Sequence, residues 1–271
     1  MLKKIVAIVV LGLAVASASA LATATGAAAD ATDPAAAYKA SHDTDPHVPL
    51  SASDQALLAS KERAAAAHAA GSSMQAIVPL SAVALAANQQ PQQTSYWCGP
   101  ATLAESLGQK GVSMSQSSAA SYLRTTTSGT AWSGVNANVP SPTGYPMRDV
   151  MNWKLRSTFY VPKALPYSPS SSDMSTYDAN LHADIDSRYP IMGDAWEVLG
   201  GPRLTGHPGD REIFHWFNIR GYDYFPGTNL TLYEDSVHGA VTISWSGNVP
   251  AYVTFESNTL VRIMGGRGYV W

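Results

Sequence analysis

The chain has 271 residues, of which 17 are basic and 20 are acidic, so its formal net charge is −3. This mild acidity gives no reason to expect nucleic acid or an anionic membrane as a partner. Seven tryptophans and thirteen tyrosines favour an ordered fold over a disordered chain, and the length suffices for one domain with a large core.

The first twenty residues predict an export signal. Lys3 and Lys4 precede an unbroken apolar run of twelve residues over 5–16, and small residues at 18–20 match a cleavage site of the A-x-A type. A run of that length is too short to span a bilayer, which takes about twenty residues. We therefore expect residues 1–20 to be removed and the mature protein to be secreted and extracellular, without membrane contact.

Residues 21–87 are dominated by alanine and contain few aromatic side chains. Ser53 can cap a helix that starts at Asp54 and stops at Gly71. Ala64–Ala67 give this helix a strong intrinsic propensity but little apolar area to bury. The segment is therefore predicted to be either a linker or a pro-segment, with one weak helix.

The remaining residues, 88–271, predict one domain whose first part is helical. Helical signals are a small-residue periodicity, a possible capping box, a proline at a helix start and a four-residue apolar repeat. The small-residue periodicity lies at Cys98–Leu107, and the possible capping box is formed by Ser113 and Gln116. The helix-start proline is Pro146, and the apolar repeat is Tyr177, Leu181 and Ile185.

The second part of this domain predicts β-strands, most of them separated by Gly, Pro or Asn. The expected strands are Ile191–Val198, Glu212–Tyr222, Leu230–Glu234, Ala240–Trp245, Ala251–Glu256 and Leu260–Met264. Helices followed by an antiparallel sheet indicate an α+β fold.

Cys98 is the only cysteine, so it cannot form an internal disulfide. Gly99 and Pro100 follow it, and proline is well tolerated in a first helical turn, so Cys98 is expected at a helix N-terminus. The partial positive charge there favours the thiolate, which is the nucleophilic form. The alternative is a buried structural cysteine.

A thiolate that attacks an acyl group needs a proton carrier, and His215 is the best candidate. Ile213, His215, Phe217 and Ile219 alternate onto one strand face, which would give the imidazole a fixed orientation and little solvent. The other histidines lie in the alanine-rich segment, on a helix expected to be solvated, in a loop or in a turn: His42, His47, His68, His182, His207 and His238.

A third group must orient the imidazole, and Asp235 is expected to do so because it follows a strand that can lie beside that of His215. Asp223 and Asn218 compete for this role, although Asn218 points to the opposite strand face. A zinc site remains a further alternative. Its ligands would be His207, Asp210, Glu212 and His215, but their spacing matches no established ligand motif.

The stretch QQTSYWCGPATLAESL, with HWFNIRGYD and YEDS downstream, resembles the double-glycine-peptidase-like branch of the papain-like cysteine peptidases. The resemblance implies a papain-like fold in which the nucleophile helix packs on a C-terminal antiparallel sheet. It also implies that Cys98 is the nucleophile, His215 the base and Asp235 the orienting acid. Gln92, six residues before the cysteine, would share the oxyanion with the backbone N–H of Cys98, although the adjacent Gln93 leaves this register open.

The expected function is therefore that of a secreted cysteine peptidase acting on a peptide or protein, with no cofactor and no metal, as a monomer. An exported chain without a transporter segment does not fit the cleavage of bacteriocin leaders. A cell-wall amide hydrolase or a transglutaminase-like acyl transferase would use the same residues. A catalytically silent binding protein is the third alternative, with Trp132, Tyr145 and Trp245 lining a groove unless they belong to the core.

Overall fold

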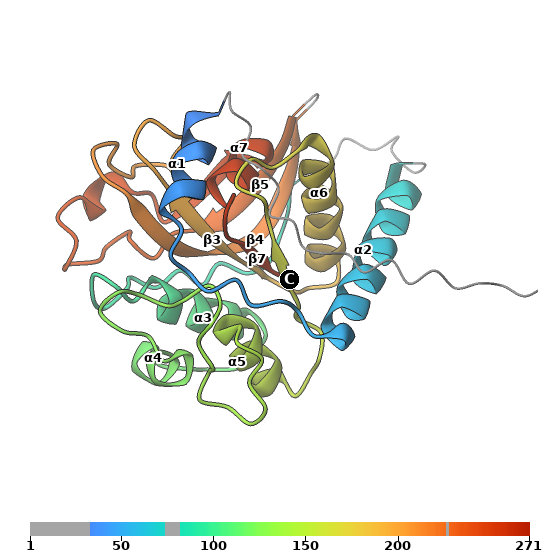
Figure 1. Ribbon diagram of the computed structural model, residues 1–271, viewed down its shortest axis with the longest axis horizontal. Helices are drawn as coiled ribbons and strands as arrows, with labels where there is room; N and C mark the ends of the chain where they lie inside the picture. The colour runs from blue at the N-terminus through green and yellow to red at the C-terminus, as the bar shows by residue number, and fades with distance from the viewer. Residues whose placement is uncertain (1–32, 74–81, 226–227) are drawn as a thin grey trace, which may run out of the picture.

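The computed structural model describes residues 33–73, 82–225 and 228–271. The predicted export signal, residues 1–20, lies outside the described residues. Within them, helices dominate the first half and strands the second, and the sheet lies between two groups of helices (Figure 1). In this part of the chain no helix is both long and apolar enough to cross a membrane.

The sheet has seven strands, and every neighbouring pair is antiparallel. The strand order is β2 (Pro162–Ala164), β7 (Gly268–Val270), β3 (Ile191–Glu197), β4 (Ile213–Phe225), β5 (Thr228–Glu234) and β6 (Tyr252–Glu256), with β1 (Val83–Ala84) paired to the far end of β4. The long strand β4 is therefore central. Along one of its edges, its first part pairs with β3 and its later part pairs with β1.

Helices cover both faces of this sheet (Figure 1). One face carries α3 (Cys98–Gln109), with α4 (Gln116–Leu123) and α5 (Pro146–Leu155) packed against it. The other face carries α6 (Ser171–Asp186) and α7 (Ser257–Ile263), and α2 (Ala52–Ser73) packs outside α6. The short helix α1 (Pro34–His42) precedes all of these.

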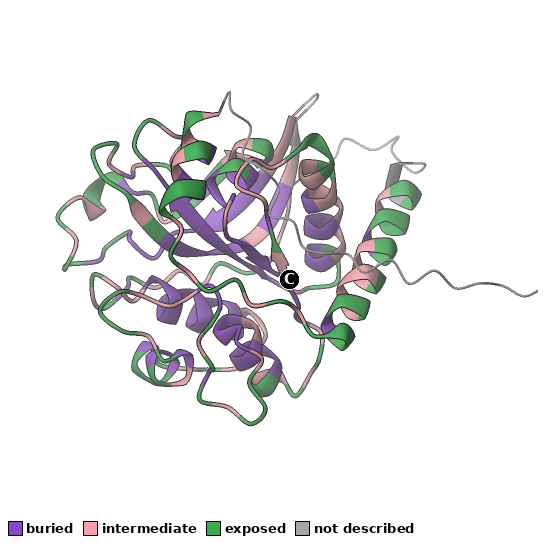
Figure 2. Ribbon diagram, viewed as in Figure 1, coloured by how far each residue is buried: buried purple, intermediate pink, exposed green. Residues whose placement is uncertain are grey.

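Alternate residues of β4 enter two separate cores, because successive side chains of a strand point to opposite faces. Trp216 joins Leu103 of α3 in one apolar cluster, whereas Phe217 joins Tyr177 of α6 and Tyr233 of β5 in the other. All of these side chains are buried, and Figure 2 shows the buried residues concentrated in the strands, over nearly all of α3 and on part of α6. The sheet is thus enclosed on both faces.

Most of the predicted elements are confirmed. The helices expected around Cys98–Leu107, after Pro146 and over Tyr177–Ile185 are α3, α5 and α6, and four of the six expected strands are β3, β4, β5 and β6. Helix α4 is also present, but Ser115 caps it by accepting the N–H of Ser118, so the proposed capping box of Ser113 was wrong.

Two expected strands were wrong. Residues 240–245 form turns that lead into a short 3₁₀-helix at Ser246–Asn248. Most of Leu260–Met264 belongs to the C-terminal part of helix α7, which ends at Ile263 with Met264 as its C-cap. The carboxylate of Glu256 accepts the N–H groups of Asn258 and Thr259 and so caps the start of this helix. The apolar side chains that suggested a strand are buried on one side of this helix.

The described part of residues 21–87 contains two helices, not the single weak helix expected from its composition. The expected helix, α2, begins earlier than predicted, at Ala52, and Ser51 instead of Ser53 receives the N–H of Asp54. Leu57 and Leu58 of α2 pack against the core on the α6 side of the sheet.

We call residues 33–50 the N-terminal arm, and it is fixed to the domain by buried polar contacts. The Lys39 ammonium donates to the carbonyls of Arg262, Ile263 and Gly265 at the C-terminal end of α7, which is a favourable place for a cation. Burial lowers the pKa of Lys39 to about 7, and the nearby Arg267 adds to this effect. The arm is therefore packed on the domain along its described length.

Gly193 of β3 faces Phe217 of β4 directly, and a Cβ at residue 193 would collide with the buried phenyl ring. We expect Gly193→Ala to lower the free energy of unfolding by about 1–3 kcal/mol, the usual cost of overpacking a core. Gly71→Ala in α2 is the matched control, since nothing lies within 4 Å of its added methyl group. The control should leave stability unchanged or raise it by up to about 1 kcal/mol in a urea titration; equal losses in both variants would contradict this packing.

Candidate active site

Cys98 is the first residue of α3, as the sequence predicted. No side chain caps this helix end, so its positive end faces the thiol without a competing cap. Gly99 is required here because a Cβ would collide with the side chain of Thr130. The cysteine is 7% exposed, and therefore only the edge of the thiol reaches the surface.

His215 lies near the beginning of β4, opposite Ala195 of β3. Its imidazole interacts with the side chain of Cys98, and this interaction raises the pKa of His215. Its Nε2 lies 3.0 Å from Oδ1 of Asp235, although the N–H direction deviates from the line of an ideal hydrogen bond. The structure thus brings together the three residues that the sequence proposed as nucleophile, base and orienting acid.

Asp235 reaches this position because it directly follows β5, which runs antiparallel to β4 and carries the chain back toward the start of β4. The carboxylate is fully buried, and its Oδ1 also accepts the N–H of Val237 at 2.9 Å. The two competitors lie elsewhere. Asp223 pairs with Leu230 farther along the sheet, and Asn218 bonds to Ser106 of α3 instead of to His215.

The charges of this pair support each other. Burial alone would lower the pKa of His215, but the charge and hydrogen bond of Asp235, together with Cys98, raise it well above its ordinary value. Burial would likewise raise the pKa of Asp235, but His215 and a second histidine, His207, hold it below the usual range. The imidazole is therefore protonated at neutral pH, and the carboxylate is ionised.

Gln92 is buried next to this group, whereas Gln93 is exposed. The side-chain carbonyl of Gln92 accepts the hydroxyl of Ser236 at 3.2 Å, and its amide donates to the carbonyl of Thr94 at 2.8 Å. Ser236 follows Asp235 directly, so this amide is held between the orienting acid and the loop that leads to Cys98. Of the two glutamines, the geometry fits Gln92.

The sequence considered His207 only as a loop residue and a possible zinc ligand and did not consider Glu197, yet both lie in the group around Asp235. His207 was expected in an ordinary loop, but its ring is buried and its Nε2 lies 3.1 Å from Oδ2 of Asp235. Its Nδ1 lies 3.0 Å from Oε1 of Glu197, the last residue of β3. The one available signal was the carboxylate of Glu197 at the end of a mostly apolar strand. His182 was also predicted wrongly, since it is buried and stacks on Tyr222.

The proposed set of zinc ligands does not come together among the described residues. Asp210 is exposed and pairs with Arg211, and Glu212 accepts the indole N–H of Trp196. Ligand atoms of His207 and His215 do lie within 4.8 Å of one another, but with Asp235 as the third member. In that arrangement the carboxylate faces ring nitrogens of both histidines.

A cavity of about 570 Å³ opens beside Cys98. Its walls include the aromatic rings of Trp132, Phe214 and Trp216, and its polar groups include Asp194 and Arg267. Burial raises the pKa of Asp194 to about 8, so this carboxyl group is mostly neutral at pH 7. The N-terminal arm closes part of the same cavity with His42, Thr44 and Asp45.

The three aromatic residues considered for a binding groove have different roles. Trp132 lines the cavity beside Cys98 and stacks on Trp216 at 5.8 Å between ring centroids. Tyr145 is buried against Trp132 and donates its hydroxyl to the arm at Val48. Trp245 packs edge-on against His207. They do not form one continuous groove.

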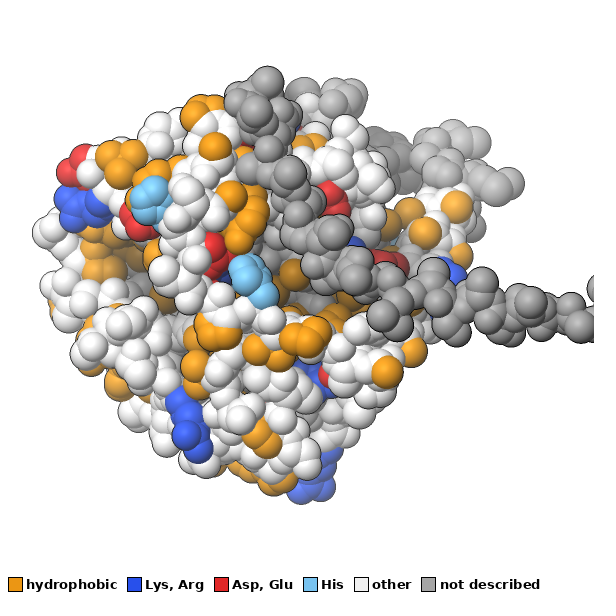
Figure 3. Space-filling view, viewed as in Figure 1, with side chains coloured by type: hydrophobic (Ala, Val, Ile, Leu, Met, Phe, Trp, Pro, Cys, Tyr) orange, Lys and Arg blue, Asp and Glu red, His pale blue; other side chains and the backbone are white. Residues whose placement is uncertain are grey.

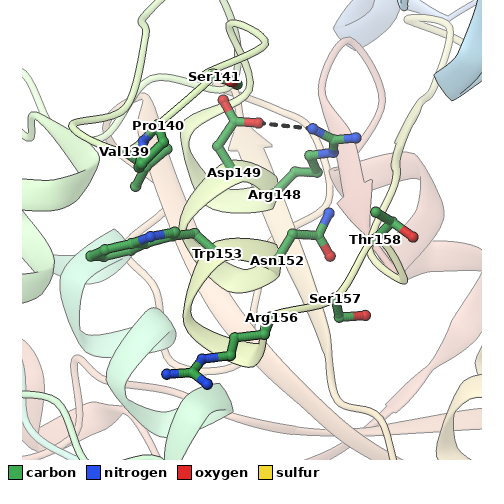
Figure 4. A pocket seen from close by; sticks show the side chains of 10 residues that line it. All are labelled: Val139, Pro140, Ser141, Arg148, Asp149, Asn152, Trp153, Arg156, Ser157 and Thr158. Atoms are coloured by element: carbon green, nitrogen blue, oxygen red, sulfur yellow. Dashed lines mark hydrogen bonds and ion pairs between the residues drawn. The ribbon is translucent and has the colours of Figure 1, made fainter.

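A second cavity, of about 730 Å³, lies over α5 and shares no lining residue with the first (Figure 4). Among its polar side chains, Arg148, Asp149 and Asn152 already have partners within the protein. Figure 4 shows Arg148 directed at Asp149, and Asn152 bonds to the backbone of Tyr160. This cavity offers no chemistry comparable to that around Cys98.

Comparison with known proteins agrees with this site. Residues 84–252 match the model of the peptidase C39-like family, and the match includes Gln92, Cys98, His215 and Asp235. The chain belongs to the peptidase C39-like family. This is a family of papain-like cysteine peptidases, and the α+β papain-like fold expected from the sequence is confirmed.

Two further comparisons add little. No curated protein matches the chain. Among solved structures, the chain is similar to the digestive procathepsin L 3 of Tenebrio molitor larval midgut, with 14% identity and a TM-score of 0.34 over 72% of this chain and 71% of that chain. A likeness at this level carries no argument about activity.

Removing the charge of Asp235 tests the ion pair through its pH dependence. Because the pKa of Asp235 is lowered in the folded protein, its ionised carboxylate contributes stability above pH ~3.9. Because the pKa of His215 is raised, its protonated ring contributes stability that is fully present below pH ~6.5. This contribution of His215 is lost as the pH rises through its raised pKa. Asp235→Asn should therefore cost about 3–5 kcal/mol of unfolding free energy near pH 5–6, and this difference should shrink at alkaline pH.

Asp223→Asn is the matched control, because Asp223 lies on β4 away from the histidines. Urea titrations at pH 5.5, 7 and 9.5 would measure both variants. A penalty for Asp235→Asn that stays constant over this range would rule out the ion pair.

Proposed function

We propose that this member of the peptidase C39-like family is a secreted, stand-alone cysteine peptidase of the double-glycine-peptidase-like branch. The observation that carries the proposal is the contact of Cys98 at the start of α3 with His215, whose other nitrogen faces Asp235. Three residues from distant parts of the chain meet in one buried group beside a cavity. The export signal predicted in residues 1–20 supports the extracellular location.

The reaction proceeds through an acyl-enzyme. The Cys98 thiolate attacks the carbonyl carbon of the substrate, and the new C–S bond places the negative charge on the carbonyl oxygen. The N-terminal end of α3 and the amide of Gln92 stabilise this oxyanion. The His215 imidazolium gives its proton to the leaving amine, and the C–N bond breaks.

Hydrolysis of the acyl-enzyme reverses these roles. His215, now neutral, takes a proton from a water molecule, whose oxygen attacks the thioester carbon. The C–S bond breaks, the free acid leaves, and the thiolate–imidazolium pair is restored. Asp235 stays ionised throughout. It stabilises the His215 imidazolium before acylation and again after His215 has taken the proton from water.

The cavity beside Cys98 supports a peptide substrate. Aromatic walls from Trp132, Phe214 and Trp216 can bury an apolar side chain, and Asp194 adds one polar group at the wall. A cell-wall amide hydrolase or a transglutaminase-like acyl transferase would use the same three residues. These alternatives differ in the acyl acceptor or substrate, and parallel assays with casein, peptidoglycan and a labelled amine separate them.

The arm supports the pro-segment alternative over the linker alternative. Its residues His42, Thr44 and Asp45 line the cavity that contains Cys98. Asp43 and Asp45 pair with Arg267, which lies under the arm at the same cavity, with nitrogen–oxygen distances of 3.2 and 3.3 Å. Figure 3 shows the face over which the arm runs, where charged side chains are sparse and scattered. We infer that the arm restricts access of substrate to Cys98.

The nucleophile is tested by labelling one sample of the mature protein with iodoacetamide at neutral pH and a separate sample with a broad thiol-directed peptidase inhibitor. We expect modification at Cys98, located by mass spectrometry, and complete loss of peptide hydrolysis in Cys98→Ala with an unchanged urea midpoint. An unreactive thiol in folded protein would rule out the activated nucleophile. A labelled but hydrolytically silent protein would indicate the binding function.

The arm is tested by the double variant Asp43→Asn/Asp45→Asn, which removes both partners of Arg267. We expect Cys98 to be labelled several-fold faster, because the arm leaves the cavity more often. Glu62→Gln is the matched control, since it removes the ion pair of Lys163 outside the cavity. Equal labelling rates in wild type, double variant and control would mean that the arm is a structural linker.

A further inference from the structure

We propose that His207 is a positioning residue for the reaction, that it carries a permanent positive charge, and that Glu197 holds it against the carboxylate of Asp235. The buried group would then have five members, in the order Cys98, His215, Asp235, His207 and Glu197. This inference rests on the proposed function, because it concerns the residue that orients the base.

The side chain of His207 uses both ring nitrogens. Nε2 lies 3.1 Å from Oδ2 of Asp235, and Nδ1 lies 3.0 and 3.1 Å from the two carboxylate oxygens of Glu197. The side chains of all three residues have no exposed surface. A neutral imidazole donates from only one nitrogen, so two facing carboxylates are satisfied only by the protonated ring.

The loop between β3 and β4 is arranged around Glu197, which explains why His207 cannot easily move. The backbone N–H of Leu204 donates to Oε1 of Glu197 at 2.9 Å, and Arg203 lies at 3.5 Å from Oε2. The backbone N–H of His207 donates to the carbonyl of Leu204. The ring of Trp245 packs edge-on against the imidazole, with the ring centroids 4.9 Å apart. These contacts fix the ring on several sides.

Asp235 needs such a partner because its two oxygens have different tasks. Oδ1 faces His215 and accepts the N–H of Val237, while Oδ2 faces His207. With Oδ2 held, the carboxylate cannot rotate away from His215. His207 thus acts on the base only through Asp235, since it makes no hydrogen bond with His215 itself; the two rings meet edge-on at 5.1 Å.

The charges around the two histidines set the pH dependence. His207 faces Glu197, Asp235 and the more distant Arg203, and burial opposes its charge while both carboxylates favour it, so that its pKa is raised. His215 faces Asp235 and Cys98, and it also lies within the electrostatic reach of Asp194 on β3 and Glu105 on α3. Burial raises the pKa of Glu105 well above its ordinary value.

Two substitutions of His207 distinguish a positioning role from the effect of losing the charge alone. The amide nitrogen of glutamine occupies roughly the place of histidine Nε2, so His207→Gln keeps a donor to Asp235. The amide nitrogen of asparagine occupies roughly the place of Nδ1, so His207→Asn keeps a donor to Glu197 and loses the one to Asp235. Both variants lose the same charge and the same ring.

The readouts are peptide hydrolysis and the pH dependence of Cys98 alkylation by iodoacetamide. For His207→Asn we expect kcat/KM to fall about 10–100-fold with little change in KM. This is the range seen when a side chain that orients a metal-binding residue is removed. In the pH–rate profile for alkylation of Cys98, the alkaline limb reports deprotonation of His215. In His207→Asn this limb should move to lower pH by about one unit, because a misdirected Asp235 stabilises the His215 imidazolium less. His207→Gln should stay within about threefold of wild type and keep the limb.

Glu197→Gln should lie between these two variants, since it weakens the hold on His207 but leaves the ring facing Asp235. His182→Gln is the control for removal of a buried histidine; it alters the α6 side of the sheet and should leave the alkaline limb unchanged. Equal behaviour of His207→Asn and His207→Gln, or a wild-type limb in both, would overturn the role of His207. A wild-type limb in Glu197→Gln would overturn the role of Glu197 alone.

Wild-type protein gives a second test that does not depend on folding of the variants. In protein labelled with ¹⁵N-histidine, both ring nitrogens of His207 should carry protons at pH 8, as judged by nitrogen chemical shifts. A single neutral tautomer at that pH would overturn the proposal. If wild-type Cys98 instead alkylates like an ordinary thiol without dependence on His215, the proposed peptidase function fails, whereas the protonation of His207 is still measured separately.

Discussion

The buried carboxylate of Asp235 is the constraint on which the arrangement of this site depends. A fully buried negative charge is costly unless charged donors compensate it, and here imidazoles lie on both sides of it. One of them faces the thiol of Cys98, and the other is held by Glu197. The end of β5, the start of β4 and the end of β3 must therefore meet at one point, which the central position of β4 makes possible.

A second polar network connects α3, which begins at Cys98, to the sheet that carries His215. Ser106 of α3 donates to Asn218 of β4, and Asn218 donates to Glu234 at the end of β5. Gln92, in the segment before α3, is bonded to Ser236 through both backbone and side chain. Cys98 and His215 belong to different halves of the chain, so their contact requires these connections as well as apolar packing around Trp216.

The cavity beside Cys98 is lined partly by the N-terminal arm. The described part of the N-terminal arm contributes polar and charged residues to the cavity wall, and Arg267 is the cation on the domain side that receives the carboxylates of Asp43 and Asp45. The same contacts explain why a segment rich in alanine is packed on the domain: polar anchors at Lys39 and Asp43 supplement its small apolar area.

The sequence by itself determined the local features: the helix that begins at Cys98, the strand that contains His215, the position of Asp235 after a strand, and the α+β order of elements. These depend on periodicity, proline and turn residues within a few positions of one another. Only the tertiary structure decided that Leu260–Ile263 lies in a helix, that Gln92 instead of Gln93 is buried, and that His207 and Glu197 belong to the group around Asp235. The reason is that a pairing between side chains on separate strands and loops leaves no local pattern, since it exists only once the strands have aligned.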